Sequence, residues 1–343
     1  MAESAGRKIV ELVGAGLRPT DVLTPEAFKN AITVLHAISG STNAVLHLCA
    51  LAGRVGVELP LEVFDDFSEK TPWLVNLKPS GEYLMEDFYY AGGLPAVMSE
   101  LSSRLHLDAI TVANQSVADN LAGAKIVNAD VIAPADRPLS ERGSLVVLRG
   151  NLCPDGAVLK RSAADPKLLQ HEGRAVVFED IADLGARVDD PDLPIDAGSV
   201  MVLKNAGPVG APGMPEWGHL PIPAKLLRRG VTDLVRISDA RMSGTSYGAV
   251  VLHIAPESAI GGPLALVRDG DPIRLDVAKR SLDVLVDPAE LEARRRDWTP
   301  PPKKDERGYR RLYEDRVTQA NEGCDFDFLK GRSPVVQDAT TYH

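Results

Sequence analysis

The second half of the chain, from about residue 135, is a close succession of short β-prone runs, and this feature constrains the fold most. Only short helical stretches interrupt these runs, notably PAKLLRRG and PAELEARRR. Many strands at such close spacing favour a barrel or a compact mixed sheet over a doubly wound domain. The expected strands, in chain order, lie in SLVVLRG, AVLKRSA, RAVVFED, SVMVLKN, TDLVRIS, AVVLHIA, PLALVRDG, PIRLDV and LDVLV.

The first 125 residues show a helical pattern instead. In LTPEAFKNAITVLHAI, Thr24 suits an N-cap and Pro25 the first turn, while the apolar Phe28, Ile32 and Leu35 share one face. A second helix is expected directly after SGSTN, and a third over GGLPAVMSELSSRL. Their apolar stripes consist of Val45, Leu48 and Ala52, and of Leu94, Val97, Met98 and Leu101.

The length of 343 residues and the composition, 44% hydrophobic and 25% charged, allow two hydrophobic cores. We therefore expect two domains, over residues 1–128 and 129–330, and a tail at 331–343. The stretch RRRDWTPPPKKDERGYRR should run over the surface before CDFDFLKG docks. The last residues, TTYH, either reach a pocket or form a frayed end.

The charge pattern excludes two classes of partner. A formal net charge of −10 and the lack of any dense lysine or arginine block argue against nucleic acid and against an anionic membrane surface. Small anionic substrates remain open, because a local site can be positive on an acidic protein. No apolar run approaches the ~20 residues of a transmembrane helix, and no signal peptide is evident at the start, so we expect a cytoplasmic protein.

The three cysteines, Cys49, Cys153 and Cys324, lie far apart and form no C-x-x-C pair. Neither a disulfide framework nor a zinc knuckle is therefore expected. Three reduced thiols are the simplest interpretation, and a cluster that all three residues assemble in space is the alternative.

Four glycine-rich polar loops interrupt the pattern: SGSTNAVLH, RGNLCPDGAVLK, KNAGPVGAPGMPEWGH and SDARMSGTSYG. Any one of them alone suits an ordinary turn. The first opens a helix, so its backbone N–H groups and the Ser41 and Thr42 hydroxyls either hold a carboxylate or phosphate or simply cap the helix. His47, in the apolar stretch that follows, is expected to be a core histidine.

The last two loops carry the most reactive side chains. Glu216 is the single acid in its rigid, mostly neutral loop. Its carboxylate either binds a hard cation through oxygen or is simply solvated. Ser243 does not fit the G-x-S-x-G elbow, and a serine acts as a base only when its alkoxide is stabilised by a cation or by converging N–H donors. Arg241 either grips a substrate carboxylate or pairs with Asp239 or another acid.

Together these loops resemble the dihydroxy-acid and sugar-acid dehydratase family. The matching segments are SGSTNAVLHL, LKPSGEYLMEDFYYAGGLPAV, LRGNLCPDGAVLK, KNAGPVGAPGMPEWG, SDARMSGTSYG and APESAIGGPLALVRDGD, in family order from about residue 5 to 330. GMPEWG and ARMSGTSYG are more similar to the branch that acts on pentonates than to the branched-chain amino-acid branch, which would show GRFSGG.

The resemblance implies an α/β fold. Residues 1–128 would be the C-terminal part of an N-terminal α/β domain, mostly helical here, and residues 129–330 a swivelling β-barrel-like domain. The family removes water from a 2,3-dihydroxy acid to give a 2-keto-3-deoxy product, with an iron–sulfur cluster and a magnesium ion as cofactors.

By motif, the resemblance makes Ser243 the base and Glu216 a magnesium ligand. It makes Thr245, Ser41 and Thr42 partners of substrate hydroxyls, beside Arg241. The substrate would be a small anionic hydroxy acid, and the full-length enzyme a dimer or tetramer of identical subunits.

The chain also departs from the family pattern. Full-length members are longer at the N-terminus, and that part carries the cluster cysteines and the remaining magnesium ligands, including a modified lysine. Cys49, Cys153 and Cys324 do not occupy cluster positions, so cluster ligands are expected to be absent from this chain. Two alternatives follow: the C-terminal part of a dehydratase whose sequence was cut, or a natural fragment that is inert or acts with another subunit. Branched-chain dihydroxy acids remain the alternative substrate.

Overall fold

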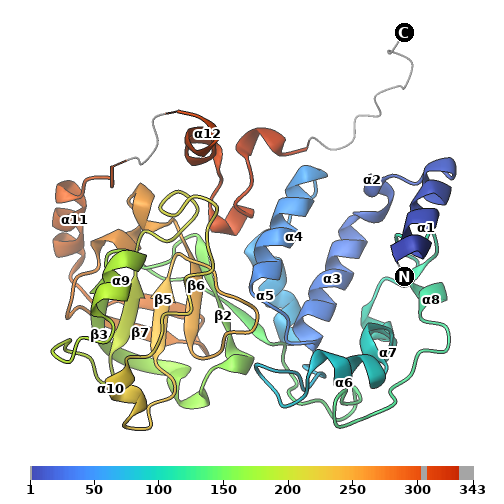
Figure 1. Ribbon diagram of the computed structural model, residues 1–343, viewed down its shortest axis with the longest axis horizontal. Helices are drawn as coiled ribbons and strands as arrows, with labels where there is room; N and C mark the ends of the chain where they lie inside the picture. The colour runs from blue at the N-terminus through green and yellow to red at the C-terminus, as the bar shows by residue number, and fades with distance from the viewer. Residues whose placement is uncertain (1, 303–306, 332–343) are drawn as a thin grey trace.

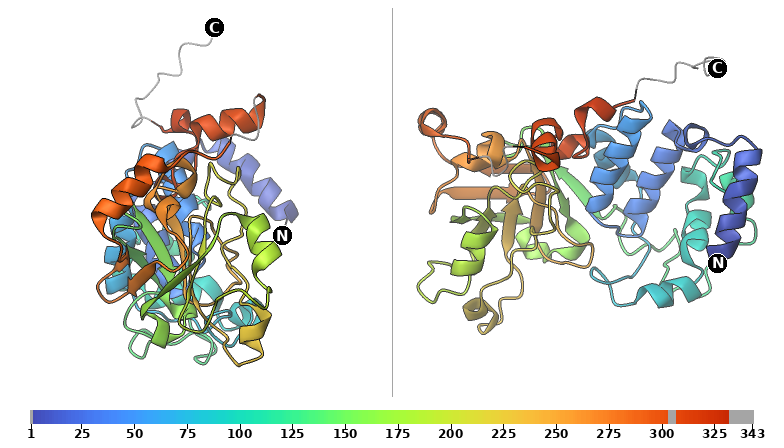
Figure 2. Two further views of the ribbon diagram at one scale, coloured as in Figure 1. Left: turned by 90° about the vertical axis from the view of Figure 1, so that its left-hand side faces the viewer. Right: turned by 45° about the horizontal axis from the view of Figure 1, so that its top comes forward.

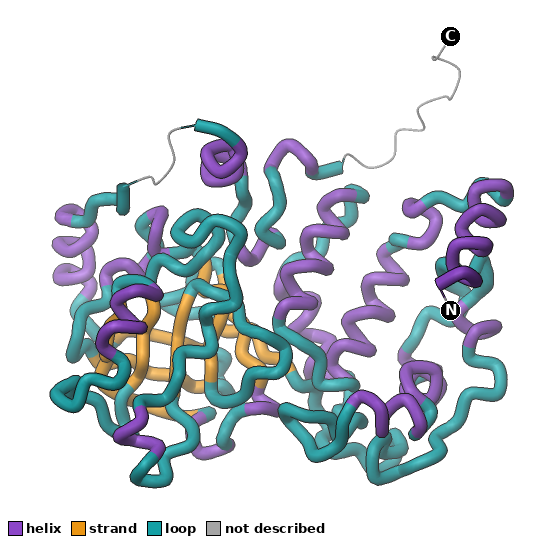
Figure 3. Tube along the Cα trace, viewed as in Figure 1, coloured by secondary structure: helices purple, strands orange, loops and turns teal. Residues whose placement is uncertain are grey.

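The computed structural model describes residues 2–302 and 307–331. A helical part and a strand-rich part lie side by side, with the strands gathered at the left of Figure 1 and in orange in Figure 3. TTYH and nearly all of the tail at 331–343 lie outside the described residues. The helical part contains α1 (Ala2–Gly14), α2 (Pro19–Val22), α3 (Pro25–Ala37), α4 (Asn43–Arg54), α5 (Leu61–Lys70), α6 (Met85–Tyr90), α7 (Gly93–Glu100) and α8 (Val117–Asn120).

The structure confirms the helix predicted over LTPEAFKNAITVLHAI, which is α3. The Thr24 hydroxyl accepts a hydrogen bond from Ala27 N at 3.3 Å, and Pro25 occupies the first helical position. Phe28, Ile32 and Leu35 are all buried. A polar cap and one apolar face therefore suffice to start this helix and fix its orientation. Helix α7 follows its expected stripe less well, because Leu94 is exposed while Val97 and Leu101 are buried.

The strand-rich part is built on a single eight-stranded sheet with the order β1-β2-β6-β5-β4-β3-β7-β8. The four central strands, β3 to β6, run parallel, and the strands on either side pair antiparallel. The strands are β1 (Leu145–Leu148), β2 (Gly156–Lys160), β3 (Gln170–Phe178), β4 (Val200–Leu203), β5 (Val235–Ser238), β6 (Val250–Ala255), β7 (Pro272–Asp276) and β8 (Ser281–Val284).

The two ends of the sheet approach each other. Arg149, directly after β1, forms a parallel bridge with Ser281 of β8, and the Leu282 amide donates to the Arg149 carbonyl at 2.8 Å. The sheet is therefore nearly closed into a barrel, which agrees with the prediction of a barrel or compact mixed sheet.

One predicted strand is wrong. PLALVRDG forms a short 3-10 helix, Pro263–Leu266, with Pro263 in its first turn and Leu264 and Leu266 buried. Both expected helices of this half are present as α10 (Ala224–Leu227) and α11 (Pro288–Asp297), and α9 (Ile181–Arg187) and α12 (Tyr309–Arg316) occur in addition.

The two parts share a core across β1 and β2. Ala157 and Leu159 face the interior of the barrel, whereas Val158 faces the helical part and packs in one cluster with Ile32 of α3 and Val45 of α4. This alternation follows from the pleat of β2, which sends successive side chains to opposite faces. The outer face of the barrel thus serves as a wall for the helices.

The segment 317–331 lies across the junction of both parts, at the top of Figure 1 and in red in Figure 2. The Gly331 amide donates to the carbonyl of Gly53 in α4 at 2.8 Å, and the Arg54 guanidinium binds both carboxylate oxygens of Asp325. This confirms that CDFDFLKG docks. Among the described residues, no helix is both long and apolar enough to cross a membrane.

Candidate active site at the carboxyl edge of the sheet

Two of the glycine-rich loops meet because their strands are parallel neighbours. β4 is followed by residues 204–219, which we call the Glu216 loop, and β5 by residues 239–248, the Ser243 loop. The carboxyl ends of parallel strands lie at one edge of a sheet, which is the usual place for ligands in such folds. The Gly218 amide donates to the Arg241 carbonyl at 2.8 Å, and Arg241 Nε donates to the Met214 carbonyl at 2.5 Å.

The N-terminus of α4 reaches the same edge from the helical part. The Asn43 side-chain amide donates to Glu216 Oε1 at 2.6 Å and to the Met242 carbonyl at 3.0 Å. One side chain therefore holds both loops against α4. The sequence points to Ser41 and Thr42 rather than to Asn43, although an amide at the first position of a glycine-flanked helix is a possible signal for such a bridge.

Ser243 and Thr245 lie next to each other at the tip of their loop. Their hydroxyl oxygens are 3.0 Å apart, and Ser243 is half-buried whereas Thr245 is exposed. Gly244 approaches α4 so closely that a Cβ there would lie 3.0 Å from Ser41 Cβ. Ser41 therefore lies beside the tip of the loop that carries Ser243 and Thr245. Ser243 receives no hydrogen bond from a charged side chain of the described residues.

Ser41 and Thr42 differ in their surroundings. The Ser41 hydroxyl accepts from Asn43 N at 3.2 Å, which is a local turn contact, and its side chain is half-buried. Thr42 is only 2% exposed and its side chain does not cap α4. The Ser41 hydroxyl thus lies close to Gly244 of the Ser243 loop, whereas the Thr42 side chain is buried.

Glu216 offers one carboxylate to a cation. Its side chain is exposed, and Asn43 occupies one face of Oε1. No group of three or more histidine, cysteine or acidic side chains among the described residues could hold a metal ion. A carboxylate oxygen suits Mg²⁺, which takes few protein ligands and keeps several waters, so Glu216 fits the role of one ligand in a site completed by other groups.

Arg241 forms no ion pair within the described chain. The expected alternative partner, Asp239, is fully buried and accepts hydrogen bonds from Ala206 N at 3.0 Å and Ser258 N at 2.8 Å. The predicted alternative of an Arg241–Asp239 ion pair is therefore wrong. The Arg241 side chain instead lines an open cavity of about 660 Å³ together with His47, Arg54, Tyr313 and Met214.

His47 is not a core histidine. It is exposed and lines the same cavity, because it lies on the face of α4 opposite Val45 and Cys49. The buried histidine nearby is His253 of β6, whose two ring nitrogens lack hydrogen-bond partners. Burial, with the charges of Arg241 and His47, lowers the pKa of His253 to about 3, which keeps its ring neutral.

The three cysteines do not come together. Cys49 packs between α4 and β1, Cys153 lies in the barrel core, and Cys324 contacts Met214, with 3.4 Å between the two sulfur atoms. Burial raises the pKa of Cys49 and of Cys153 to about 12, and it also raises that of Cys324. Because the three thiols lie in separate places, they do not form the joint set of ligands that an iron–sulfur cluster takes.

Comparison with known proteins identifies relatives of this arrangement. Residues 1–120 match the profile of the dihydroxy-acid/6-phosphogluconate dehydratase N-terminal family, and residues 130–324 match that of the C-terminal family. The chain is 52% identical over 333 residues to an L-arabinonate dehydratase of Rhizobium leguminosarum bv. trifolii, with 96% of this chain and 58% of the relative covered.

Two further relatives carry other substrate names. The chain is 51% identical to a 6-deoxy-6-sulfo-D-gluconate dehydratase of Pseudomonas putida, with 98% of this chain and 58% of the relative covered. It is 43% identical to a dihydroxy-acid dehydratase of Acetivibrio thermocellus, with 94% of this chain and 58% of the relative covered. The chain therefore spans well under two thirds of the length of these curated relatives. It belongs to the dihydroxy-acid/6-phosphogluconate dehydratase family of hydro-lyases.

Proposed function

We propose that this chain supplies the C-terminal portion of a dehydratase that acts on a 2,3-dihydroxy sugar acid, such as a pentonate. The observation that carries the proposal is the meeting of Glu216, Ser243 and the N-terminus of α4 at the carboxyl edge of the sheet. Two relatives that are named for sugar acids are 51% and 52% identical to the chain, against 43% for a relative that is named a dihydroxy-acid dehydratase.

In this proposal Ser243 is the base. Its Oγ takes the proton from C2 of the substrate, the hydroxyl at C3 takes up a proton from solvent and leaves as water, and Ser243 then releases its proton to solvent. The resulting enol tautomerises to the 2-keto-3-deoxy acid. A magnesium ion bound at Glu216 would supply positive charge that favours the serine alkoxide and acidifies the C2–H bond. The contact with Thr245, 3.0 Å between hydroxyl oxygens, would orient Ser243 Oγ.

Thr245, Ser41 and Arg241 are the proposed contacts for the rest of the substrate. The two hydroxyls suit substrate hydroxyls, and Arg241, which pairs with no acid among the described residues, can hold a carboxylate. Thr42 would act behind them, because its side chain is buried. The cysteines of this chain do not fit an iron–sulfur cluster, so any such cluster in the complete site is proposed to depend on residues outside this chain.

Four further proposals, on domains, location and assembly, accompany this function. A domain boundary lies near residue 128, and the strand-rich domain swivels against the helical one. The protein is cytoplasmic and assembles as a dimer or tetramer of identical subunits. A fragment that is inert without a further segment or subunit is the alternative for the chain by itself, and branched-chain dihydroxy acids are the alternative substrates.

The test is the variant Ser243→Ala in the protein that carries this chain, assayed on a panel of C4 to C6 aldonic acids and on a branched-chain dihydroxy acid. Loss of a general base lowers turnover by about 10²–10⁴-fold, whereas substrate binding and the melting temperature should hardly change. Ser246→Ala, in the same loop, is the matched control and should keep full turnover. An active Ser243→Ala enzyme would refute the base assignment, and a preference for the branched-chain acid would refute the substrate class.

A further inference from the structure

The Glu216 loop is held from behind by a buried carboxylate that has no place in the function proposed above. We propose that Glu257, together with Gln319, is a positioning residue that sets the location of Glu216 and hence the geometry of its cation site. The expected effect on metal affinity rests on the proposed function of Glu216 as a magnesium ligand. The proposal that Glu257 holds the loop in place does not, because it follows from the contacts alone.

The Glu257 carboxylate accepts hydrogen bonds from three donors. Val209 N lies 2.9 and 3.0 Å from its two oxygens, Gly210 N lies 2.8 Å from Oε2, and Gln319 Nε2 lies 2.8 Å from Oε1. Two of these donors are consecutive backbone amides of the Glu216 loop. A carboxylate that accepts several N–H groups in a buried place is a strong anchor, because each N–H would otherwise lose its partner.

The fit around this carboxylate leaves no spare room. Glu257 is 1% exposed, and a Cβ added at Gly207 would lie 2.7 Å from Glu257 Oε2. Gly207 lies two residues before Val209, so the first turn of the loop wraps around the carboxylate. The path of the loop towards Glu216 is thereby fixed at its start.

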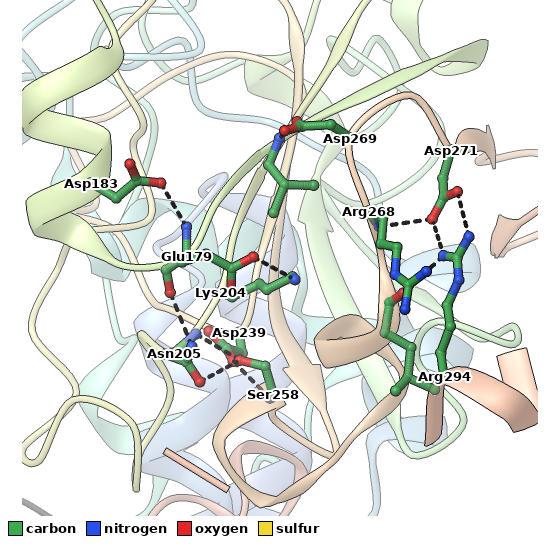
Figure 4. A network of polar contacts seen from close by, with 12 residues as sticks. Glu179, Asp183, Lys204, Asn205, Asp239, Ser258, Arg268, Asp269, Asp271 and Arg294 are labelled. Atoms are coloured by element: carbon green, nitrogen blue, oxygen red, sulfur yellow. Dashed lines mark hydrogen bonds and ion pairs between the residues drawn. The ribbon is translucent and has the colours of Figure 1, made fainter. Parts of the chain in front are cut away.

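A second buried carboxylate holds the root of the same loop. Asp239, at the end of β5, accepts from Ala206 N at 3.0 Å and from both the amide and the hydroxyl of Ser258 (Figure 4). The Ser258 hydroxyl also lies 2.6 Å from Asn205 N. Burial, followed by the nearby charge of Asp239, raises the pKa of Glu257 to about 7.

Gln319 connects this anchor to the helical part. Its side chain both donates to Glu257 Oε1 and accepts from Glu257 N, each at 2.8 Å. The segment that begins there docks on α4 through Gly323, where an added Cβ would lie 2.5 Å from Ala50 N, and through the Arg54–Asp325 pair. α4 also contributes Asn43, which binds Glu216 itself. Contacts at the start of the loop and at Glu216 thus both lead to α4, the first through Gln319 and the second through Asn43.

The experiment uses Glu257→Gln and Gln319→Leu in the protein that carries this chain. The first readout is amide hydrogen exchange at Val209 and Gly210, which should become at least about tenfold faster in Glu257→Gln, because an amide group has only one accepting oxygen for three donors. The second readout is Mn²⁺ affinity, followed by electron paramagnetic resonance of the free ion. We expect it to weaken about tenfold in Glu257→Gln and by less in Gln319→Leu.

Asp276→Asn is the control for a merely structural effect. Asp276 is also a buried carboxylate, 3% exposed, but it accepts from Lys279 N in the turn between β7 and β8, away from the Glu216 loop. This variant should lower the melting temperature without changing the exchange of Val209 and Gly210 or the Mn²⁺ affinity. Equal effects of the two carboxylate variants, or native exchange in Glu257→Gln, would overturn the proposal.

A third variant, Glu216→Gln, separates this proposal from the proposed function. If Mn²⁺ affinity does not respond to Glu216→Gln, the metal role of Glu216 fails, while hydrogen exchange still decides whether Glu257 holds the loop. If Glu257→Gln does not fold, Gln319→Leu takes its place. It removes one of the three donors to Glu257, and hydrogen exchange and Mn²⁺ affinity are measured as before. Unchanged exchange and unchanged affinity in that variant would also contradict the proposal.

Discussion

The Asn43 amide nitrogen lies 2.6 Å from Glu216 Oε1, across a sequence separation of 173 residues. This bond joins the first residue of α4 to the carboxylate at the edge of the sheet, and the same nitrogen donates to Met242 O at 3.0 Å. The contact makes the position of Glu216 a joint property of both parts of the molecule. A single isosteric substitution, Asn43→Asp, would turn this attraction into repulsion between two carboxylates.

Asn43→Asp should destabilise the protein at neutral pH. The change replaces a donor by a carboxylate directly against Glu216, and like charges at this distance near a protein surface repel by about 1–2 kcal/mol after solvent screening. The penalty should fall as pH drops and one carboxyl group becomes protonated. Urea unfolding at pH 7 and pH 4 measures both effects, and Asn128→Asp in an exposed turn is the control. A penalty that does not depend on pH would contradict the contact.

Acid should destabilise the protein through two neutral buried histidines. Burial lowers the pKa of His36 to about 4 and that of His253 to about 3, whereas unfolded histidine titrates near 6.5. The unfolded chain therefore binds more protons below pH 6.5, and stability present above that pH is lost as pH falls. For His36 the loss between pH 7 and pH 5 is about 2 kcal/mol.

The measurement compares the native protein with His36→Gln in urea at both pH values. Gln keeps a donor towards the Phe64 carbonyl, which His36 Nε2 contacts at 2.8 Å, but it does not titrate. The drop on acidification should therefore be smaller in the variant by about 2 kcal/mol. An equal drop in both proteins would show that His36 is not neutral when folded.

Arg236→Met should be among the most damaging single changes. Arg236 is completely buried in β5, pairs with Asp233 at 3.0 Å, and donates to the carbonyls of His219 and Tyr247, at the ends of the Glu216 and Ser243 loops. Removing one partner of a buried pair costs about 3–5 kcal/mol, since the other charge is left alone. Urea unfolding checks the loss. Arg236→Lys should not restore stability, because lysine lacks the planar set of donors.

A pair of glycine variants tests how closely the Ser243 loop packs on that arginine. Gly248 has φ +108°, and an added Cβ would overlap the Arg236 guanidinium, whereas Gly213 has φ +87° with nothing within 4 Å. Gly213→Ala should cost about 1–2 kcal/mol for the left-handed backbone alone. Gly248→Ala should cost more by at least about 2 kcal/mol, because overpacking is added. Similar melting temperatures of the two variants would contradict this packing.

Local signals in the sequence account for much of the fold. Thr24, Pro25 and the spacing of Phe28, Ile32 and Leu35 predict α3, because cap, first turn and apolar face lie within one short segment. The run PLALVRDG was predicted as a strand and is a 3-10 helix, because short apolar runs suit either structure. Which strands pair, and that the central four are parallel, depends on contacts between distant segments.

The candidate site, like the fold, is only partly predictable from local sequence signals. The loops that carry Glu216 and Ser243 stand out by their residue types, and their roles in catalysis remain predictions. For Asn43 the sequence offers only its place at the start of a glycine-flanked helix, and for Glu257 it offers no signal. Their partners lie far along the chain, Glu216 and Met242 for Asn43 and Val209, Gly210 and Gln319 for Glu257. The expectation that His47 is buried failed for a related reason. A helix that packs on one side only still places some residues of an apolar run in solvent.

The docking of residues 317–331 across the junction has a consequence for biosynthesis. Gln319, Cys324 and Asp325 leave the ribosome after every strand of the sheet and after α4. During translation the helices and the barrel can therefore form while the Glu216 loop still lacks part of its support. The loop gains this support only after residues 317–325 have been synthesised, so a chain stalled before residue 317 would hold every strand of the sheet and an unfinished site.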